Sequence, residues 1–260
     1  MTRLLPGAAA FTAAMLVALL GLYASADTPP EPAVGRGVAE IRLLGVNDLH
    51  GRLEPPRAGI GGAARLKSHL DGATVEGRTI RVHAGDMVGA SPLVSSWFRD
   101  EPTIEAANLI GFDVGTVGNH ELDDGGDELL RLIGLADFPY VAANTYERDG
   151  RLLLRPYTVV ERAGARVGFI GVTTPSTPKF LLDRHAARFR FADISESVNR
   201  WVPALRRQGV EAIVVLAHAG APAQGESGAP DYAGEIVAET AQMSSAVDVV
   251  VAGHSHSQLD

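Results

Sequence analysis

The sequence of 260 residues contains no cysteine. This absence excludes disulfide scaffolds, zinc sites built from thiolates and cysteine nucleophiles. A metal site in this chain would therefore use histidine, carboxylate, asparagine or backbone oxygen. Aromatic residues are also scarce, at 6% of the chain, whereas a hydrophobic content of 46% is typical of a globular protein and excludes a disordered or collagen-like chain.

Basic residues are outnumbered by acidic ones. The chain has 23 lysines and arginines against 31 aspartates and glutamates, and its net charge is -8. Proteins that bind nucleic acid through its phosphates are usually basic. The charge balance therefore argues against a nucleic-acid polymer as the main partner. It leaves room for a small phosphate ester, because bound metal ions can supply positive charge locally.

Long apolar runs are confined to the first 26 residues, which excludes a polytopic membrane protein. Arg3 precedes an apolar stretch at 8–23, and Ala24-Ser25-Ala26 follows it. This order is typical of a secretory signal peptide with its cleavage site. We predict a signal peptide at residues 1–26, no stable membrane span after cleavage, and export to the periplasm or the cell exterior. An uncleaved membrane anchor is the alternative.

Short apolar strands alternate with helical patterns from Ala39 onward. We predict a flexible linker at 27–38, rich in proline, glycine and charge, and a single domain at 39–260. The predicted strands are 41–46, 79–84, 112–117, 166–172, 210–217 and 247–252, and the predicted helices are about 60–70, 91–111, 126–135, 193–208 and 231–244. This alternation indicates a layered α/β fold, in which ligands bind at the carboxyl ends of the strands.

Polar side chains gather where five of these strands end, and five of the eight histidines are among them. The residues are Asp48, His50, Asp86, Asn119, His120, His218, His254 and His256. Carboxylate, imidazole and amide oxygen are suitable ligands for divalent metals. Residues two apart in an extended segment point the same way, so Asp48 and His50 can face one metal. Any one of these residues could cap a helix, but the set predicts a metal centre.

Other conspicuous residues are assigned to the structure rather than to the site. His83 lies inside an apolar strand and is expected to be a core histidine, whereas His185 is expected at the surface. Trp97 and Phe98 are expected to pack in the core. Glu121 is expected to make a structural hydrogen bond.

The motifs Asp48-x-His50, Gly85-Asp86, Gly118-Asn119-His120-Glu121, His218 and Gly253-His254-x-His256 resemble, in this order, those of the calcineurin-like metallophosphoesterases. Within that superfamily, NDLHG at 47–51, GGAAR at 61–65 and NHELD at 119–123 are similar to the exported bacterial 5′-nucleotidases. The resemblance covers about residues 40–260 and implies a layered α-β-β-α sandwich. The glycine pair of GGAAR fits a phosphate cradle or a plain backbone turn equally well.

The resemblance also implies roles for the clustered residues. One metal would be held by Asp48, His50, Asp86 and His256, and the second by Asp86, Asn119, His218 and His254. The cofactors would be two divalent ions of zinc, manganese or iron, and a hydroxide that they hold would attack the phosphate. His120 would act as the catalytic acid, oriented by Asp123, and Asn119 and His120 would bind the substrate.

The implied substrate is a small-molecule phosphate monoester, foremost a nucleoside 5′-monophosphate. A 2′,3′-cyclic nucleotide phosphodiesterase, a sugar-phosphate phosphatase, the related dimanganese thiohydrolase of sulfur oxidation and an inactive metal-binding fragment are alternatives. The 5′-nucleotidase family carries a C-terminal domain that holds the nucleoside, whereas this chain stops four residues after His256. We therefore expect that domain to be absent and the metallophosphoesterase domain to be incomplete at its C-terminal end.

Overall fold

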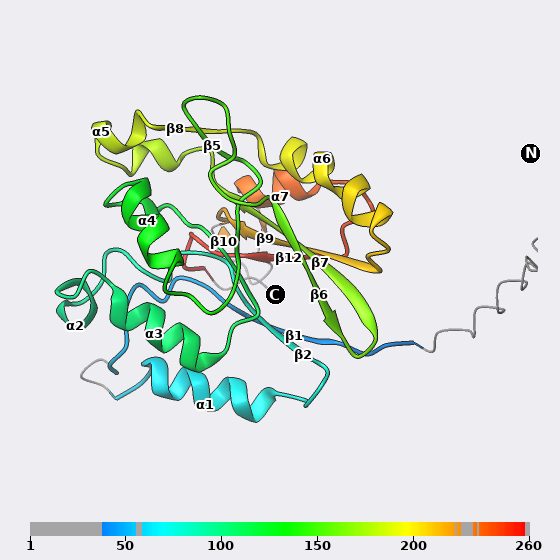
Figure 1. Ribbon diagram of the computed structural model, residues 1–260, viewed down its shortest axis with the longest axis horizontal. Coiled ribbons are helices and arrows are strands. Elements are labelled where there is room, and N and C mark those ends of the chain that lie inside the picture. Colours follow the sequence, from blue (N-terminus) through cyan, green and yellow to red (C-terminus); the bar gives the residue numbers. More distant parts are fainter. Residues whose placement is uncertain (1–37, 56–58, 222, 225–230, 233, 258–260) are drawn as a thin grey trace, which may run out of the picture. The chain divides into compact units, whose positions relative to one another are not determined.

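The computed structural model describes residues 38–55, 59–221, 223–224, 231–232 and 234–257 (Figure 1). The predicted signal peptide at 1–26 and all but the last residue of the predicted linker lie outside the described residues. In the described part of the chain, no helix combines the length and the apolar character that crossing a bilayer requires. Residues from Ala39 onward form one structural unit.

Two four-stranded sheets carry the fold. The first is parallel throughout, in the order β1-β2-β3-β4. The second has the order β12-β9-β7-β6, parallel except for β6. Their strands are β1 (Arg42–Val46), β2 (Thr79–His83), β3 (Val114–Thr116), β4 (Tyr140–Val141), β6 (Tyr157–Arg162), β7 (Ala165–Thr173), β9 (Ala212–His218) and β12 (Val249–Ala252).

Two short antiparallel pairs and the helices surround these sheets. The pairs are β5 (Thr145–Glu147) with β8 (Phe189–Phe191), and β10 (Ala223–Gln224) with β11 (Asp231–Tyr232). The helices are α1 (Ala63–Ala73), α2 (Leu93–Ser96), α3 (Glu101–Ile110), α4 (Gly126–Ile133), α5 (Asp183–Ala186), α6 (Ile194–Arg207) and α7 (Glu235–Thr240), with 3-10 turns η1 (His120–Leu122) and η2 (Thr177–Lys179).

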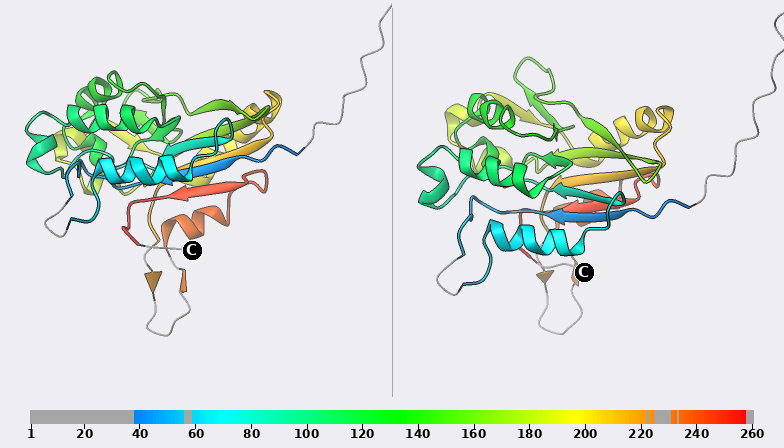
Figure 2. Two further views of the ribbon diagram at one scale, coloured as in Figure 1. Left: turned by 90° about the horizontal axis from the view of Figure 1, so that it is seen from below. Right: turned by 60° about the horizontal axis from the view of Figure 1, so that its bottom comes forward.

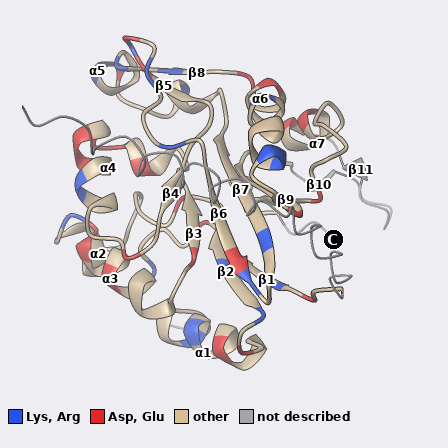
Figure 3. Cartoon of the chain, turned by 45° about the vertical axis from the view of Figure 1, so that its right-hand side comes forward, with Lys and Arg blue, Asp and Glu red and all other residues tan. Residues whose placement is uncertain are grey.

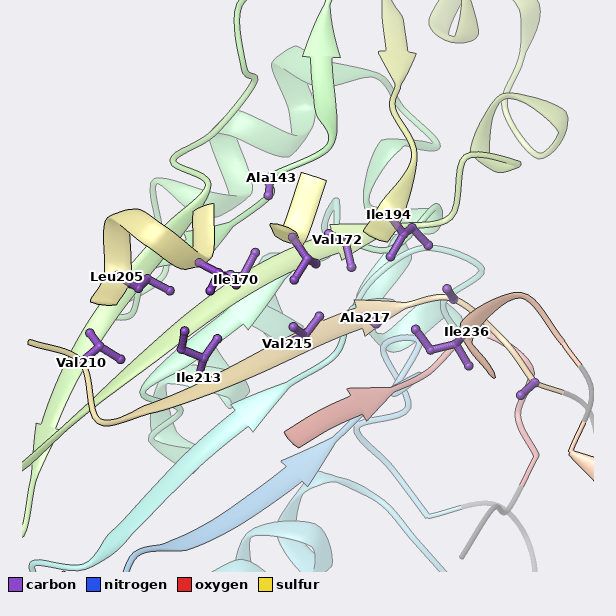
Figure 4. Close-up of a cluster of buried hydrophobic side chains, with 14 residues drawn as sticks. Ala143, Ile170, Val172, Ile194, Leu205, Val210, Ile213, Val215, Ala217 and Ile236 are labelled. Carbon is purple, nitrogen blue, oxygen red and sulfur yellow. The ribbon is translucent and has the colours of Figure 1, made fainter. Parts of the chain in front are cut away.

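The layers follow from the strand sequences, which are apolar on both faces. Phe169 and Val214 point between the two sheets and pack there with Val82. Their chain neighbours Ile170 and Ile213 point the other way, into a cluster beneath α6 (Figure 4). Buried parallel strands read as continuous apolar runs for this reason.

The outer face of the first sheet is covered in the same way. Leu70 of α1, Ile110 of α3 and Leu129 of α4 belong to one buried cluster with Tyr140 of β4. Figure 2 shows α1 lying alongside β1. The order of layers is helix, sheet, sheet, helix, and the predicted α-β-β-α sandwich is confirmed.

The single helix predicted at 91–111 is wrong, because the chain breaks between α2 and α3. Arg99 and Asp100 adopt left-handed backbone conformations, with φ of 54° and 59°. The Asp100 carboxylate accepts a hydrogen bond of 2.6 Å from the Ser95 hydroxyl, which closes the turn. Trp97 and Phe98 are 76% and 60% exposed on this turn, so their predicted place in the core is also wrong.

His83 is a core histidine, as predicted. It is fully buried, and the rings of Phe112, Phe138 and Tyr140 meet it edge-on at centroid distances of 5.3, 5.5 and 5.0 Å. Its Nδ1 accepts a hydrogen bond of 3.3 Å from the backbone N–H of Gly85. Burial lowers the pKa of His83 from 6.5 to about 3, because the apolar surroundings disfavour the imidazolium.

We predict that His83 makes the folded protein less stable as the pH falls below 6.5. Between about pH 6.5 and 3 the unfolded chain binds a proton at this residue that the folded chain does not. Above pH 6.5 His83 is neutral in both states and does not affect how the free energy of unfolding varies with pH. Below pH 6.5 it lowers the free energy of unfolding by up to about 1.4 kcal/mol per pH unit. Urea titrations with chelator at pH 6, 5 and 4 should give His83→Leu a shallower pH dependence than the wild type.

The exposed His69 on α1 offers the matched control. His69→Leu should follow the wild-type pH dependence, since water surrounds this imidazole in both states. Parallel pH profiles for His83→Leu and the wild type would contradict the prediction.

Candidate metal centre

The carboxyl ends of the two sheets meet at one place and bring the predicted ligands together. Asp48 and His50 follow β1, Asp86 follows β2 and Asn119 follows β3 of the first sheet. His218 is the last residue of β9, and His254 and His256 follow β12 in the second sheet. Each candidate ligand is positioned by the end of its strand. The packing of the two sheets brings these ends, and hence the side chains, into one cluster.

One group of side chains joins the two sheets at Asp48, His50 and His256. Their ligand atoms lie within 4.8 Å of one another. The Nε2 atoms of His50 and His256 are 3.2 Å apart, and His256 Nε2 is 3.3 Å from Asp48 Oδ1. Asp48 also accepts hydrogen bonds of 3.2 and 3.0 Å from the backbone N–H of His254, which fixes the carboxylate against the second sheet.

A second group is formed by Asp86, His218 and His254, again within 4.8 Å. His218 Nε2 lies 3.0 Å from Asp86 Oδ2 and 3.2 Å from Asn119 Oδ1, and all three residues are buried. Asp86 Oδ2 is also 3.8 Å from His50 Nε2 of the first group. Asp86 therefore stands between the two groups, where a bridging ligand would be expected.

The donor set fits divalent cations. The Nδ1 atoms of His50 and His218 each lie 2.9 Å from a backbone carbonyl, of Gly89 and Ala84, so Nδ1 carries the proton. In neutral His218 the Nε2 lone pair then faces the acceptor oxygens of Asp86 and Asn119, and such contacts need a cation or a further proton between them.

Asp86 and His218 shift each other's pKa in opposite directions. Burial opposes the imidazolium of His218, but the hydrogen bond and charge of Asp86 raise the pKa of His218 to about 9. Burial would raise the pKa of Asp86, yet the hydrogen bond and charge of His218 lower it. A divalent cation would take the place of that proton.

The loops that carry the ligands are held in sparsely populated backbone conformations. Asp48, His50, Asp86, His254 and His256 all have positive φ, between 48° and 83°. Such conformations cost free energy in residues other than glycine and persist only where the surroundings enforce them. They turn each ligand toward the cluster immediately after its strand.

Glu121 enforces part of this geometry, in the structural role predicted for it. Its buried carboxylate accepts hydrogen bonds from the backbone N–H of Asp86 at 2.9 Å, Met87 at 2.8 Å and Gly118 at 2.6 Å. Burial raises the pKa of Glu121 to about 7. This side chain thus ties the loop after β2 to the loop after β3.

His120 forms a further candidate group with His50 and Asp86, and it pairs with Asp123, as expected. Its Nδ1 is 2.7 Å from Asp123 Oδ2, and this hydrogen bond raises the pKa of His120. His185 was expected at the surface, but it is half-buried, and its Nδ1 donates a hydrogen bond of 2.8 Å to the Asp123 carbonyl. No local pattern could have revealed a contact between residues so distant in the sequence.

A cavity of about 410 Å³ opens over the cluster. Its walls include His50, Asp86, Asn119, His120, His254 and His256. Sequence reasoning missed four further residues that line it: Arg52, Ala90, Phe180 and Ser255. The Phe180 ring meets His254 edge-on at a centroid distance of 5.4 Å and is 52% exposed. A small anion could therefore reach the candidate ligands from solvent.

The sequence profile of the calcineurin-like phosphoesterase family matches residues 41–258. The chain belongs to this family. A cell wall protein of Listeria monocytogenes is 36% identical over 90% of this chain and 34% of its own length, and an endonuclease of Bacillus subtilis is 35% identical over 90% and 20%. The structure of a 5′-nucleotidase precursor from Thermus thermophilus superposes with a TM-score of 0.64, at 29% identity over 83% of this chain and 42% of the other.

The chain thus spans about a third of the Listeria protein and a fifth of the Bacillus protein. The family predicted from the strand-end motifs is confirmed. Members of the calcineurin-like family use divalent metals, and candidate ligand groups for them are present here.

Gly118 allows the loops after β2 and β3 to approach closely. A Cβ at this position would lie 2.1 Å from Asp86 Oδ1 and 2.7 Å from the Asp86 backbone nitrogen. The Gly85 position is also tight, since a Cβ there would lie 2.7 Å from His218 Nδ1. Only a residue without a side chain leaves Asp86 where it is.

We predict that Gly118→Ala weakens divalent-ion binding without unfolding the protein. The added methyl group must push the Asp86 carboxylate away, and changes around metal ligands typically lower affinity about 10–100-fold. Calorimetric titration with Mn²⁺ measures the loss, and circular dichroism checks the fold. Gly72→Ala in α1 is the matched control, because a Cβ there meets nothing within 4 Å. Equal Mn²⁺ affinities in the two variants would contradict the placement of Asp86.

Proposed function

We propose that the protein is an exported phosphoesterase that uses two divalent metal ions to hydrolyse phosphate monoesters, foremost nucleoside 5′-monophosphates. The observation that carries the proposal is the position of Asp86, whose Oδ2 lies 3.8 Å from His50 Nε2 of the first group and 3.0 Å from His218 Nε2 of the second. A shared carboxylate suits a pair of adjacent cations, the arrangement used in many phosphoryl-transfer enzymes.

Each cation would have its own set of ligands. Asp48, His50, Asp86 and His256 would hold one, and Asp86, Asn119, His218 and His254 the other. Zinc, manganese and iron all suit this mixture of imidazole, carboxylate and amide oxygen. When bound, the pair supplies positive charge for the phosphoryl oxygens and activates water at neutral pH.

His120 and Asp123 would serve the substrate rather than the metals. Asp123 occupies Nδ1 of the imidazole, which leaves Nε2 available to a substrate oxygen in the cavity. His120 can then donate a hydrogen bond to the phosphoryl group or a proton to the leaving alkoxide. Asn119 would contact the substrate together with His120.

A second candidate function is phosphodiester hydrolysis on the same residues. The Bacillus relative is named an endonuclease, and a 2′,3′-cyclic nucleotide presents a small diester that the cavity of about 410 Å³ could admit. A sugar phosphate is a further monoester candidate. Substrate profiling separates these classes.

The activity test is phosphate release from AMP by the purified protein with Mn²⁺ or Zn²⁺, and with a chelator control. We expect chelator-sensitive release, faster than from glucose 6-phosphate and faster than the opening of 2′,3′-cyclic AMP to adenosine monophosphate, which is followed by chromatography because it frees no phosphate. Asp86→Ala should lose activity and metal together, because its carboxylate serves both sites. His120→Ala should keep the metal and lose about 10²–10⁴-fold in kcat.

Metal analysis gives these variants a readout beyond activity. Two ions still bound to Asp86→Ala would refute the ligand assignment. A folded, metal-loaded wild type that releases no phosphate from AMP or glucose 6-phosphate, and does not open 2′,3′-cyclic AMP to adenosine monophosphate, would instead identify a metal-binding protein without phosphoesterase activity.

Export is part of the proposal. It is supported by the signal-peptide pattern of residues 1–26, and the Listeria relative is named a cell wall protein. We predict that the protein recovered from an exporting bacterial host begins at Asp27, which intact-mass spectrometry would show. A recovered mass that retains residues 1–26 in the membrane fraction would favour the uncleaved anchor.

A further inference from the structure

A second cavity, of about 550 Å³, adjoins the metal centre and has no role in the proposed reaction. It lies between the end of β1, the turn at Ile60–Gly62 and the first turns of α1. Arg65 and His69 stand four residues apart on α1 and line it from the same face. We call this cavity the α1 groove.

Arg52 links the α1 groove to the metal centre. It lines both the groove and the cavity over the candidate ligands. Asp48, a candidate ligand, also borders the groove. A substrate whose scissile phosphate lies at the ligands could therefore extend past Arg52 into the groove.

Two arginines and one carboxylate are the charged residues among the described lining of the groove, which is otherwise largely apolar, so positive charge exceeds negative there in a chain of net charge -8. Arg52 and Arg65 are exposed, and neither guanidinium group makes an ion pair or hydrogen bond with any residue that the structure describes. Several arginines elsewhere are held by carboxylates, as Arg81 is by Asp71 and Arg188 by Asp127, whereas Arg207 on α6 is an exposed arginine for which the described residues supply no such partner. Figure 3 shows acidic and basic residues close together on α1 and α4.

Asp48 does not neutralise these arginines. It is the one carboxylate among the described residues that line the groove, and it already accepts two hydrogen bonds from the His254 backbone N–H. Two guanidinium groups without carboxylate partners form a suitable site for phosphate, which arginine binds through paired N–H donors.

We propose that the α1 groove binds a second phosphate of the substrate through Arg52 and Arg65, so that the protein selects phosphate esters carrying two phosphate groups. The proposal rests on the proposed phosphoesterase function, because the first phosphate must lie at the metal ligands. Arg52 and Arg65 are specificity-determining residues in this arrangement.

Binding is tested without hydrolysis. Calorimetry with the Mn²⁺-loaded protein compares propane-1,3-diphosphonate with propylphosphonate, which differ only in the second anion and contain no cleavable ester. We expect the diphosphonate to bind roughly tenfold more tightly to the wild type. The ratio should fall toward one in Arg52→Ala and decrease in Arg65→Ala.

Arg207→Ala is the matched control, since it removes the same charge from an exposed position on α6. It should keep the wild-type ratio. A diphosphonate preference that survives in Arg52→Ala and Arg65→Ala would come from chelation of the metal and would overturn the proposal.

Kinetics separates this proposal from the function on which it rests. We expect kcat/KM for adenosine 3′,5′-bisphosphate to exceed that for AMP, and the excess to disappear in Arg52→Ala. Hydrolysis of both esters with a ratio insensitive to Arg52 and Arg65 would overturn the subsite and leave the phosphoesterase function standing. No hydrolysis of either ester, with the arginine-dependent binding ratio intact, would overturn the phosphoesterase function and support the anion site.

Discussion

The contact between Asp86 and His218 is the interaction on which the site depends. Both side chains are buried, their facing atoms are 3.0 Å apart, and each belongs to a different sheet. Neutral His218 directs a lone pair at the carboxylate, so that a proton or a metal cation must lie between them. In an apolar interior this contact costs free energy unless a proton or a metal cation lies between the two atoms. The packed fold therefore favours a cation at this position.

Close packing of the two sheets makes this contact possible. Glycines at 85 and 118 let the loops after β2 and β3 approach, and Glu121 holds the backbone of both loops through three hydrogen bonds. The left-handed conformations of the ligand-bearing residues are the local cost of this arrangement. The continuous apolar core between the sheets, centred on residues such as Phe169, stabilises it.

Sequence patterns located the six central strands, with small shifts of boundary, because buried parallel strands are short apolar runs that end abruptly at polar residues. The helix at 91–111 failed because a hydrogen-bonded turn at Asp100 outweighed helical propensity. The short strands β4, β5, β8, β10 and β11 carry too few residues for a recognisable period. His185 and Phe180 were missed because their contacts join segments far apart in the chain.

The sequence by itself determined the candidate ligands, their order and their place after strand ends, because alternation of strands and helices forces the carboxyl ends of parallel strands to one edge. It also determined the family, through motifs that are read along the chain. Only the tertiary structure decided that Asp86 lies between both ligand groups, that backbone carbonyls set the histidine tautomers, and that Arg52 joins two cavities. These relations depend on how two separate sheets pack against each other. No local sequence pattern encodes the distances between residues that lie in different sheets.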